Sequence, residues 1–594
     1  MREYTTPGEV QLPEGANLLH PLWHHASETP DRPLLAYRDG DRFVDVTAAQ
    51  FAARVQQLAR GLVGLGVEAD ERVAIMSSTR IEWTYLDYAI LAAGAATVPI
   101  YETSSPDQIE WILSDSGARF AFFATDDLYK QYLEIADRVP LDRTFVIDQG
   151  GLEEVDAAGE GVDHTVLELR GEQIGPETLA TIIYTSGTMG RPKGCIATHG
   201  NYRWDAIQAV ANLEELFTPS DRTLLFLPLA HSFAKLIQVG SIEAGVTIGY
   251  ATSPQHLIEE LPLFKPTFLL SVPRIWEKVY NGAVAKANEE GKGKIFQRAV
   301  DVAVKYSRGQ QKGSVGLGTR IQHAIFDRLV YSRLRERLGG ELRNAVSGGA
   351  ALGERLGHFY NGIGVTVLEG YGLTETSAGA TSNRPDSFRI GSVGRPFPGC
   401  TVRIGDDGEV LIKGGNVFKG YWQNEEATKE DLDDEGWFYS GDVGELDDDG
   451  FLYITGRKKE LIVTAGGKNV APNVLEDGLR SHRLVSQSMV VGDDKPFIAA
   501  LVTIDPEEFP RWAEQHGKAG KSVSDVTDDP DLRAEIEGAI ANANKSVSRA
   551  ESIREFRILP EDFTIEGGEL TPTLKVKRRV VADKYAHVID DIYP

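Results

Sequence analysis

The feature that most constrains the fold is an alternation of short β-rich runs with helical stretches, which begins near residue 73. Residues 73–76 and 96–100 are β-rich runs, and a helical pattern lies between them. The alternation continues to residue 147. It indicates an α/β domain whose strands are largely parallel, because a helical crossover joins parallel neighbours. Ligands of such sheets bind at the carboxyl ends of the strands, so the loops there are the candidate sites of chemistry.

Later segments predict the domain organisation. Further strand candidates run into loops rich in Gly, Ser, Pro or His, and they are residues 179–184, 223–227, 268–272 and 342–346. Residues 281–340 have helical spacing and predict a helical insertion packed on the main domain. Short hairpins after Gly399 predict a β-rich subdomain. We expect a large domain of mostly parallel sheets over residues 1–456 and a small mobile α+β domain over residues 457–594.

Length and composition exclude several classes of protein. A chain of 594 residues exceeds a single core, so two or more domains are expected. The formal charge of -26 would repel a phosphate backbone, so nucleic acid is not an expected partner. The apolar runs are too short to span a bilayer and the start lacks a signal segment, so we expect a cytoplasmic protein.

Candidate metal sites must use oxygen ligands. The two cysteines, Cys195 and Cys400, give no disulfide framework and no cysteine-rich metal site. The acidic residues 445–456 invite a calcium interpretation, but the twelfth loop position is Gly456 and not a bidentate Glu. A turn between two strands is therefore the expected structure there.

The most informative stretch follows a β-rich run directly and reads Thr185-Ser186-Gly187-Thr188-Met189-Gly190-Arg191-Pro192-Lys193-Gly194. Its glycines let the backbone approach an anion, its hydroxyls and backbone N–H groups can donate to phosphate oxygens, and Lys193 adds positive charge. It is not a Walker loop, since the nearest match, Gly520-Lys521-Ser522, has Gln515 where the first Gly belongs. A phosphate-binding loop of another kind is predicted.

With this loop the sequence resembles the adenylate-forming superfamily of acyl-CoA synthetases, luciferases and peptide-synthetase adenylation domains, whose signature is Thr-Ser-Gly-Thr-x-Gly-x-Pro-Lys-Gly. Six further motifs follow in the family's order over most of the chain, at residues 227–233, 347–350, 371–376, 437–442, 456–459 and 570–575. The resemblance implies an enzyme that activates a carboxylic acid with ATP as an acyl-adenylate and transfers the acyl group to coenzyme A.

The resemblance also implies a nucleotide site. Gly348, Gly349, Ala350 and Tyr371 would enclose the adenine, and Asp442 would accept hydrogen bonds from both ribose hydroxyls. The other residues implied to bind the nucleotide are Thr185, Ser186, Gly187, Thr188, Gly190, Lys193, Gly372, Thr374 and Arg457. Glu375 resembles the magnesium ligand, with Thr188 nearby, and both are catalytic candidates. The expected cofactors are ATP and Mg²⁺, with coenzyme A as co-substrate.

Lys575 is the main catalytic candidate. A long cationic side chain can bridge the substrate carboxylate and the α-phosphate, and it offsets the charge that builds up when two anions meet. The family usually has Gly before this lysine, whereas Leu574 stands here, and Lys577 is an alternative. Alignment of Thr571 with the family's threonine favours Lys575. His231, by resemblance, lines the path to the acyl carboxylate.

A moving domain is implied as well. In the family the small domain swings between the two reactions, and the residue that matches the hinge is Lys459. The swing would bring residues 466–469 close to the pantetheine channel. Gly467 suits such a channel because a side chain there would obstruct it.

Three features look like long-chain fatty acid–CoA ligases: the helical insertion, the segment 271–278, and the Leu-Thr-Pro-Thr-Leu-Lys form of the lysine motif. The alternatives are a ligase for medium-chain or aromatic acids, an acyl-AMP ligase that loads a carrier protein, and an inactive fatty acid binder. The insertion is locally basic, which indicates either a peripheral membrane contact or a solvated helix face; its basic residues are Lys292, Lys294, Arg298, Lys305, Arg308 and Lys312. The sequence predicts no oligomeric state.

Overall fold

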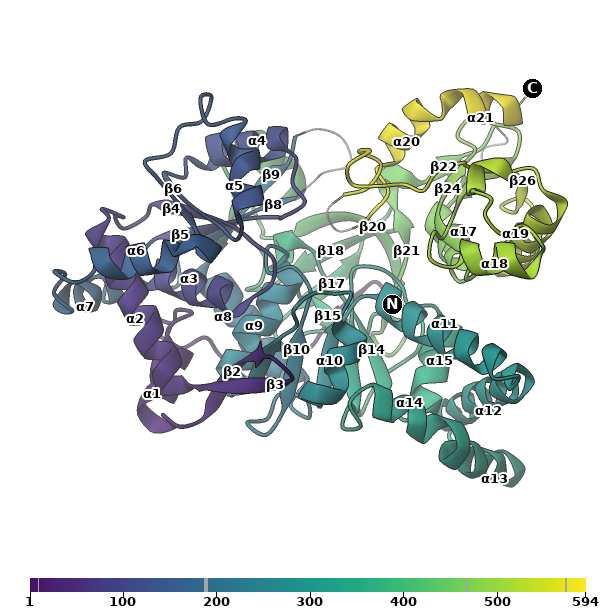
Figure 1. The fold of residues 1–594 in the computed structure, drawn as a ribbon, viewed down its shortest axis with the longest axis horizontal. Helices are drawn as coiled ribbons and strands as arrows, with labels where there is room; N and C mark the ends of the chain where they lie inside the picture. The colour runs from purple at the N-terminus through teal and green to yellow at the C-terminus, as the bar shows by residue number, and fades with distance from the viewer. Residues whose placement is uncertain (9, 186–190, 466–467, 572–573, 594) are drawn as a thin grey trace.

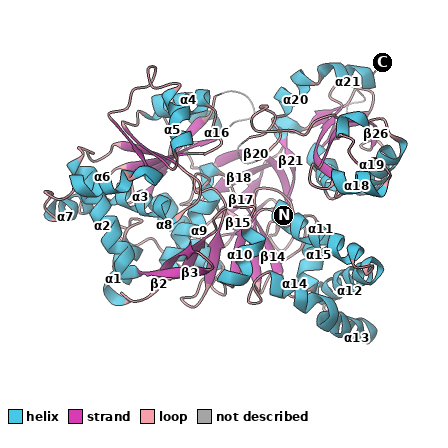
Figure 2. Cartoon of the chain, in the orientation of Figure 1, coloured by secondary structure: helices cyan, strands magenta, loops and turns pink. Residues whose placement is uncertain are grey.

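The computed structural model describes residues 1–8, 10–185, 191–465, 468–571 and 574–593. Over these ranges the chain forms two large, mostly parallel sheets, a five-stranded antiparallel sheet and a smaller C-terminal unit (Figure 1). Helices pack around the strands of the large sheets (Figure 2). The sequence predicts this α/β architecture, including its β-rich part and its small α+β part.

The seven-stranded sheet has the order β19-β9-β8-β5-β4-β6-β7 and contains the first β-rich runs of the alternation. Strands β4 to β7 are parallel, and β8 joins β5 in parallel, whereas β9 pairs antiparallel with β8 and with the edge strand β19. The strands are β4 (Arg72–Met76), β5 (Ala96–Ile100), β6 (Phe120–Phe123), β7 (Arg143–Val146), β8 (Leu179–Thr185), β9 (Lys193–Thr198) and β19 (Gly420–Tyr421). The helices of this region are α1 (His20–Glu28), α2 (Ala48–Gly64), α3 (Ile81–Ala92), α4 (Pro106–Ser116), α5 (Asp126–Leu133), α6 (Gly151–Ala158) and α7 (Thr165–Gly171).

The nine-stranded sheet has the order β16-β15-β14-β13-β12-β10-β11-β2-β3. Its six central strands are parallel, and β3, β15 and β16 are antiparallel at the edges. The strands are β2 (Pro33–Asp39), β3 (Arg42–Thr47), β10 (Arg222–Leu225), β11 (Thr247–Tyr250), β12 (Phe268–Ser271), β13 (Asn344–Ser347), β14 (Thr366–Tyr371), β15 (Thr381–Ser382) and β16 (Arg395–Pro396). Its helices include α8 (His199–Asn212), α9 (Ser232–Ala244), α10 (Leu257–Phe264) and α15 (Glu354–Gly362).

A buried ion pair ties α9 to α3. The Lys235 ammonium lies 2.7 and 2.6 Å from the two carboxylate oxygens of Asp87, and both side chains are fully buried. Thr97 and Gln238 donate further hydrogen bonds to the same carboxylate, at 2.8 and 3.2 Å. A buried charge pair is tolerated when its remaining hydrogen-bonding capacity is met in this way. The contact fixes the start of α9, where the His231 motif lies.

The five-stranded sheet contains the predicted hairpins and also the N-terminus. Its order is β1-β17-β18-β20-β21, all antiparallel. The strands are β1 (Glu3–Thr5), β17 (Thr401–Ile404), β18 (Glu409–Lys413), β20 (Phe438–Leu446) and β21 (Leu452–Arg457). The sequence did not predict that the N-terminal strand pairs with β17, because register partners such as Glu3 and Arg403 lie far apart in the chain.

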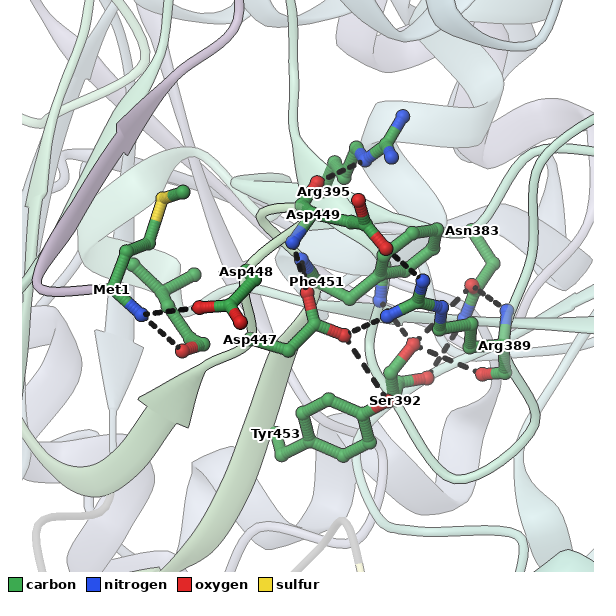
Figure 3. Close-up of polar contacts among 12 residues, drawn as sticks. Met1, Asn383, Arg389, Ser392, Arg395, Asp447, Asp448, Asp449, Phe451 and Tyr453 are labelled. Atoms are coloured by element: carbon green, nitrogen blue, oxygen red, sulfur yellow. Dashed lines mark hydrogen bonds and ion pairs between the residues drawn. The ribbon is translucent and has the colours of Figure 1, made fainter.

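The acidic segment between β20 and β21 is a turn, as predicted. Figure 3 shows that the Asp447 carboxylate accepts hydrogen bonds from the backbone N–H groups of Asp449 and Phe451, at 2.9 and 3.0 Å. Arg389 forms ion pairs with Asp447 and Asp449 and lies over the Phe451 ring. These contacts occupy the carboxylates within the turn. No cluster of three or more His, Cys, Asp or Glu residues suited to a metal ion occurs in the described ranges.

The segment predicted as a helical insertion consists of helices, and the first begins at Pro273. They are α11 (Pro273–Glu289), α12 (Gly293–Gln311), α13 (Leu317–Phe326), the π-helical turn η2 (Asp327–Tyr331) and α14 (Ser332–Arg337). Helix α12 packs so closely on α15 that a Cβ atom on Gly362 would lie 2.2 Å from the carbonyl oxygen of Ala303. None of the helices in the described ranges combines the length and apolarity that crossing a bilayer requires.

The C-terminal unit has its own core around the fully buried Trp512. Its three-stranded sheet has the order β24-β25-β26. The elements are β22 (Ile462–Val463), β23 (Asn469–Val470), α17 (Pro472–Arg480), β24 (Val485–Val491), β25 (Ile498–Ile504), α18 (Phe509–Gln515), α19 (Pro530–Ala543), β26 (Ile553–Ile558), α20 (Arg578–Lys584) and α21 (Ala586–Ile592). Mixed strand directions and separate helices match the predicted α+β character.

Candidate active site

The motif residues gather where parallel strands end. Strand β13 ends just before Gly348, and its parallel neighbour β14 ends at Tyr371, so the two loops lie side by side. Strand β8 ends at Thr185, where the Gly- and Thr-rich loop begins. The predicted nucleotide-binding residues Ser186, Gly187, Thr188 and Gly190, and the predicted channel residue Gly467, lie outside the described residues.

Asp442 is fixed by two of the predicted site residues. The Tyr371 hydroxyl donates to Oδ2 of Asp442 at 2.7 Å, and Nε of Arg457 donates to Oδ1 at 2.9 Å. Asp442 and Arg457 are register partners in the β20–β21 hairpin. Each carboxylate oxygen can accept more than one hydrogen bond, so both oxygens of Asp442 remain able to accept from a diol. Burial, and then the Asp442 charge, raise the pKa of the Tyr371 hydroxyl, which therefore stays protonated.

The loop after Tyr371 folds back tightly, which explains Gly372. A Cβ atom at this position would lie 1.9 Å from the carbonyl oxygen of Ala378. The return of the chain also forces the left-handed region on Ser377 and Ala378, at φ of 53° and 100°. The Thr374 hydroxyl lies 3.4 Å from the Ser232 hydroxyl at the start of α9. A similar close approach explains Gly348, where a Cβ atom would lie 3.0 Å from the Phe233 ring.

The carboxylate of Glu375 shares a hydroxyl group with a second carboxylate. The Tyr421 hydroxyl lies 3.0 Å from Oε1 of Glu375 and 2.9 Å from Oδ2 of Asp431. One hydroxyl proton serves only one of these acceptors at a time. Burial raises the pKa of Glu375, and Asp431 raises it further, while Tyr421 partly opposes the shift. The carboxylates thus favour a cation beside them, which fits the expected magnesium site.

Lys193 and the chain around Tyr421 complete this cluster. The Lys193 ammonium lies 3.5 Å from Oδ2 of Asp431 and 4.3 Å from the centre of the Tyr421 ring. Asp431 ends helix α16 (Glu425–Asp431). Sequence reasoning missed Tyr421 and Asp431, because β19 reaches the site only by pairing with β9, more than two hundred residues earlier. The aromatic run at Tyr421 and Trp422 belongs to none of the recognised motifs and gave no local signal.

Lys575 lies on a tight turn. The Thr571 hydroxyl accepts from the backbone N–H of Lys575 at 3.0 Å, and the Thr571 N–H donates to the Lys575 carbonyl at 2.8 Å. Between them Leu574 has a φ of 60°, in the left-handed region that favours glycine. The backbone conformation at this position therefore explains why the family usually has glycine there. In this chain Leu574 occupies the same left-handed conformation at some cost in backbone strain.

Lys575 lies close to other predicted site residues. Desolvation by nearby protein atoms lowers the pKa of Lys575, although its side chain is exposed at the surface. Arg457 lowers this pKa further, whereas Asp442, Glu460 and Glu375 raise it. These groups act on Lys575 only because the C-terminal unit brings it to the nucleotide site. The backbone N–H of the alternative lysine, Lys577, donates to the Glu569 carbonyl at 2.7 Å.

His231 is held as a neutral hydrogen-bond donor. Its Nδ1 accepts from the backbone N–H of Phe233 at 3.2 Å and caps α9, which assigns the ring proton to Nε2. Burial, with a smaller effect from the Lys575 charge, lowers the pKa of His231 to about 4. The imidazole is therefore neutral near pH 7. Its Nε2–H can donate to a substrate oxygen.

The predicted hinge residue directly follows a lysine that ion pairs anchor to the five-stranded sheet. The Lys458 ammonium forms ion pairs with Asp407 and Glu409, at 2.6 and 2.8 Å, and so holds the end of β21 to β18. Lys459 follows in a short helical turn, and its side chain is exposed. The chain leaves the five-stranded sheet at this point.

The C-terminal unit contacts helix α11 through ion pairs that the sequence did not predict. Nη2 of Arg274 lies 2.6 Å from Oδ2 of Asp505, and the Lys278 ammonium lies 3.1 Å from Oε1 of Glu507. Arg511 donates to the carbonyl oxygen of Ala285 at 3.0 Å. These contacts hold the C-terminal unit in the arrangement that places Lys575 beside the site.

Comparisons with known proteins agree with this geometry. The sequence profile described as AMP-binding enzyme matches residues 22–422, and the profile described as AMP-binding enzyme C-terminal domain matches residues 459–594. The long-chain-fatty-acid–CoA ligase FadD15 of Mycobacterium bovis is 50% identical over 598 residues, which cover 100% of both chains. The long-chain-fatty-acid–CoA ligase ACSBG2 of Xenopus laevis is 31% identical, over 95% of this chain and 82% of its own.

Solved structures share the fold. The A domain of carboxylic acid reductase from Segniliparus rugosus, in complex with AMP and a co-purified carboxylic acid, superimposes with a TM-score of 0.75 at 22% identity. The superposition covers 98% of this chain and 94% of that one. At this identity the likeness establishes the fold alone.

Proposed function

Because the chain belongs to the AMP-binding enzyme family, we propose that it is an ATP-dependent long-chain fatty acid–CoA ligase. The observation that carries the proposal is 50% identity over the full length of both chains to a ligase of that name. In the first reaction a fatty acid and ATP give acyl-AMP and pyrophosphate. In the second, acyl-AMP and coenzyme A give acyl-CoA and AMP.

Each side chain of the site has a role in the first reaction. Tyr371 and Arg457 orient Asp442, which accepts hydrogen bonds from the ribose hydroxyls. Lys575 bridges the fatty acid carboxylate and the α-phosphate, and it offsets the charge of the two anions as they meet. His231 donates from Nε2 on the path to the carboxylate.

The remaining proposed nucleotide contacts surround these residues, and they are Thr185, Ser186, Gly187, Thr188, Gly190, Lys193, Gly348, Gly349, Ala350, Gly372 and Thr374. Glu375 and Thr188 would supply oxygen ligands to Mg²⁺, the ligand type that this hard cation prefers. When bound, Mg²⁺ neutralises phosphate charge and polarises the phosphoryl oxygens. The raised pKa of Glu375 beside Asp431 supports a cation at this position.

The second reaction requires the small domain to move. Lys575 fills the space that the coenzyme A thiol must enter, so a domain comprising residues 457–594 swings relative to residues 1–456 about Lys459. The exposed Lys459 directly after the anchored Lys458 supports a hinge there. Gly467 would then line the pantetheine channel.

The substrate comes from membranes, so we also propose a cytoplasmic enzyme that makes peripheral membrane contact. The basic helical insertion supports that contact. We propose no nucleic acid partner, because the overall charge of -26 would repel a phosphate backbone.

ATP–pyrophosphate exchange over a panel of acids tests the function. Palmitate and oleate should give kcat/KM values orders of magnitude above acetate or benzoate, because each buried methylene contributes about 0.8 kcal/mol. Product analysis with coenzyme A present should show acyl-CoA, AMP and pyrophosphate. A preference for acids shorter than about eight carbons would indicate a medium-chain ligase. Acyl-AMP that accumulates with coenzyme A but disappears with a carrier protein would indicate a carrier-loading enzyme.

A further inference from the structure

The helical insertion has a charge opposite to that of the rest of the protein. Residues 292–337 contain eleven Lys or Arg residues and three Asp or Glu residues, a formal charge of +8 in a chain of charge -26. Among the described residues, this segment forms only two ion pairs, Lys292 with Glu290 and Arg335 with Asp327. Its other cations therefore face solvent with their charge uncompensated, although the protein has 88 acidic side chains.

Helix α13 and η2 carry an exposed aliphatic stripe. The side chains of Leu317, Ile321, Ile325 and Leu329 are 74%, 55%, 53% and 55% exposed. Every fourth residue of a helix lies on one face, so these side chains form a stripe about 18 Å long. Figure 1 shows α13 at the outer end of the projection that α11, α12 and α13 form.

The inner face of α13 and η2 anchors them to the rest of the protein. Nε2 of His323 lies 2.6 Å from the Gly362 carbonyl, and its ring stacks on Tyr306 at a centroid distance of 3.8 Å. The Tyr331 hydroxyl donates to the Ala299 carbonyl at 2.6 Å. Packing within the protein thus uses these groups together with Phe326 and Val330, whereas the four side chains of the stripe stay exposed. Folding alone gives no reason for aliphatic residues on the outer face.

A basic cleft lies beside the stripe. It has a volume of about 590 Å³ and is formed by α12, the turn before α13 and Arg355 of α15. Its charged lining residues are Lys305, Arg308, Lys312, Arg355 and one carboxylate, Asp301. A cleft with this excess of cations suits a phosphate group.

We propose that the outer face of α13 and η2, with this cleft, is the surface on which the protein docks to an anionic phospholipid bilayer. The aliphatic stripe enters the boundary between headgroups and acyl chains, and the cleft cations contact headgroup phosphates. The inference deepens the proposed function and rests on it in one respect, that a fatty acid substrate reaches the enzyme from a membrane.

Charge distinguishes this partner from a second copy of the chain. A symmetric dimer through α13 would bring two such segments, each of charge +8, against each other. Like charges in contact oppose association, whereas an anionic bilayer complements them.

Vesicle sedimentation tests the surface. The full chain should sediment at low salt with phosphatidylcholine vesicles that contain about one-third phosphatidylglycerol, and not with phosphatidylcholine alone. The variant Ile321→Gln/Ile325→Gln/Leu329→Gln should bind about a hundredfold more weakly. The variant Lys305→Gln/Arg308→Gln/Lys312→Gln should lose a similar factor, at about fivefold for each charge.

A matched control removes exposed leucines elsewhere. Leu133 and Leu169 are 51% and 61% exposed, and Leu133→Gln/Leu169→Gln should bind vesicles like the unaltered protein. With palmitate supplied on albumin, all of these variants should keep normal ligase activity, because none of these residues belongs to the proposed active site.

Several outcomes would overturn the inference. They are an active ligase that fails to sediment with the anionic vesicles at low salt, a triple aliphatic variant that sediments normally, and a dimer in sedimentation velocity that this variant abolishes. Vesicle binding that depends on α13, in a protein with no activity on any fatty acid, would refute the proposed function and leave the docking surface standing.

Discussion

The guanidinium of Arg274 donates a 2.6 Å hydrogen bond to the carboxylate of Asp505, which lies 231 residues later in the chain. Arg274 belongs to helix α11, and Asp505 directly follows strand β25 of the C-terminal unit. The same arrangement puts Lys575 near His231 and Arg457. The ion pair therefore stabilises the arrangement suited to adenylation.

Arg274→Ala should lower pyrophosphate exchange by up to about tenfold, since the loss of a half-buried ion pair across an interface weakens docking of the C-terminal unit. Conversion of supplied acyl-adenylate and coenzyme A should not fall. Lys278→Gln is the matched control, because its pair with Glu507 is more exposed and should contribute about twofold or less. Adding Asp505→Ala to Arg274→Ala should cause little further loss, and fully additive losses would contradict a direct coupling.

Lys575→Ala should reduce pyrophosphate exchange by a factor on the order of a hundred or more, because charge offset at two meeting anions is lost. The variant should still convert supplied acyl-adenylate and coenzyme A to acyl-CoA. Lys577→Ala is the control and should exchange normally. The reverse result, with exchange lost only in Lys577→Ala, would place the catalytic lysine two residues later.

Lys459→Pro should retain exchange and lose thioester formation. Proline fixes φ, so a hinge at this residue could no longer absorb the backbone change that the swing requires. Lys459→Ala keeps backbone freedom and should behave like the unaltered enzyme in both half-reactions. Normal acyl-CoA formation by the proline variant would exclude Lys459 as the hinge.

Glu375→Gln should lower turnover and raise the magnesium concentration needed for half-maximal exchange, because a neutral amide is a poor ligand for a hard cation. Circular dichroism and thermal unfolding should show an intact fold. An unchanged magnesium dependence would refute a ligand role for Glu375.

Acid should destabilise the fold through the buried His199 and the half-buried His231. Burial, and then the charges of Lys235 and His20, lower the pKa of His199 to about 3, and the pKa of His231 is lowered to about 4. Between these values and 6.5 the unfolded chain binds protons that the folded chain does not. The free energy of unfolding therefore falls as pH falls from 6.5 towards 4, by about 1.4 kcal/mol per pH unit for each histidine.

Urea unfolding of His199→Asn checks this dependence. Asparagine can still accept the hydrogen bond that Leu18 donates to Nδ1 of His199, and it does not titrate. The variant's stability loss at pH 7.5 measures the packing cost. Its further loss between pH 6.5 and 5 should be smaller than that of the unaltered protein, and an equal loss would contradict the assignment.

The sequence determined those features that contiguous residues encode. The alternation of β-rich and helical runs identified β4, β5 and β6, because side-chain periodicity follows local backbone geometry. Motifs made of neighbouring residues predicted that the loop after β8 and the loop at Tyr371 bind the nucleotide. The structure added the reason for one departure from the family pattern, since Leu574 occupies a left-handed turn where glycine fits better.

Tertiary structure alone decided which distant residues meet. Tyr421 and Asp431 reach Glu375 because β19 pairs with β9, and Arg274 meets Asp505 because the C-terminal unit packs on α11. Strand β1, near the N-terminus, joins the five-stranded sheet by pairing with β17, about four hundred residues later in the chain. The helical spacing of the insertion predicted packing on the main domain, but Ile321, Ile325 and Leu329 face outward. Periodicity shows that these side chains share a face, not which face packs inward. Such contacts depend on how separate elements pack in space, which no local pattern of residues encodes.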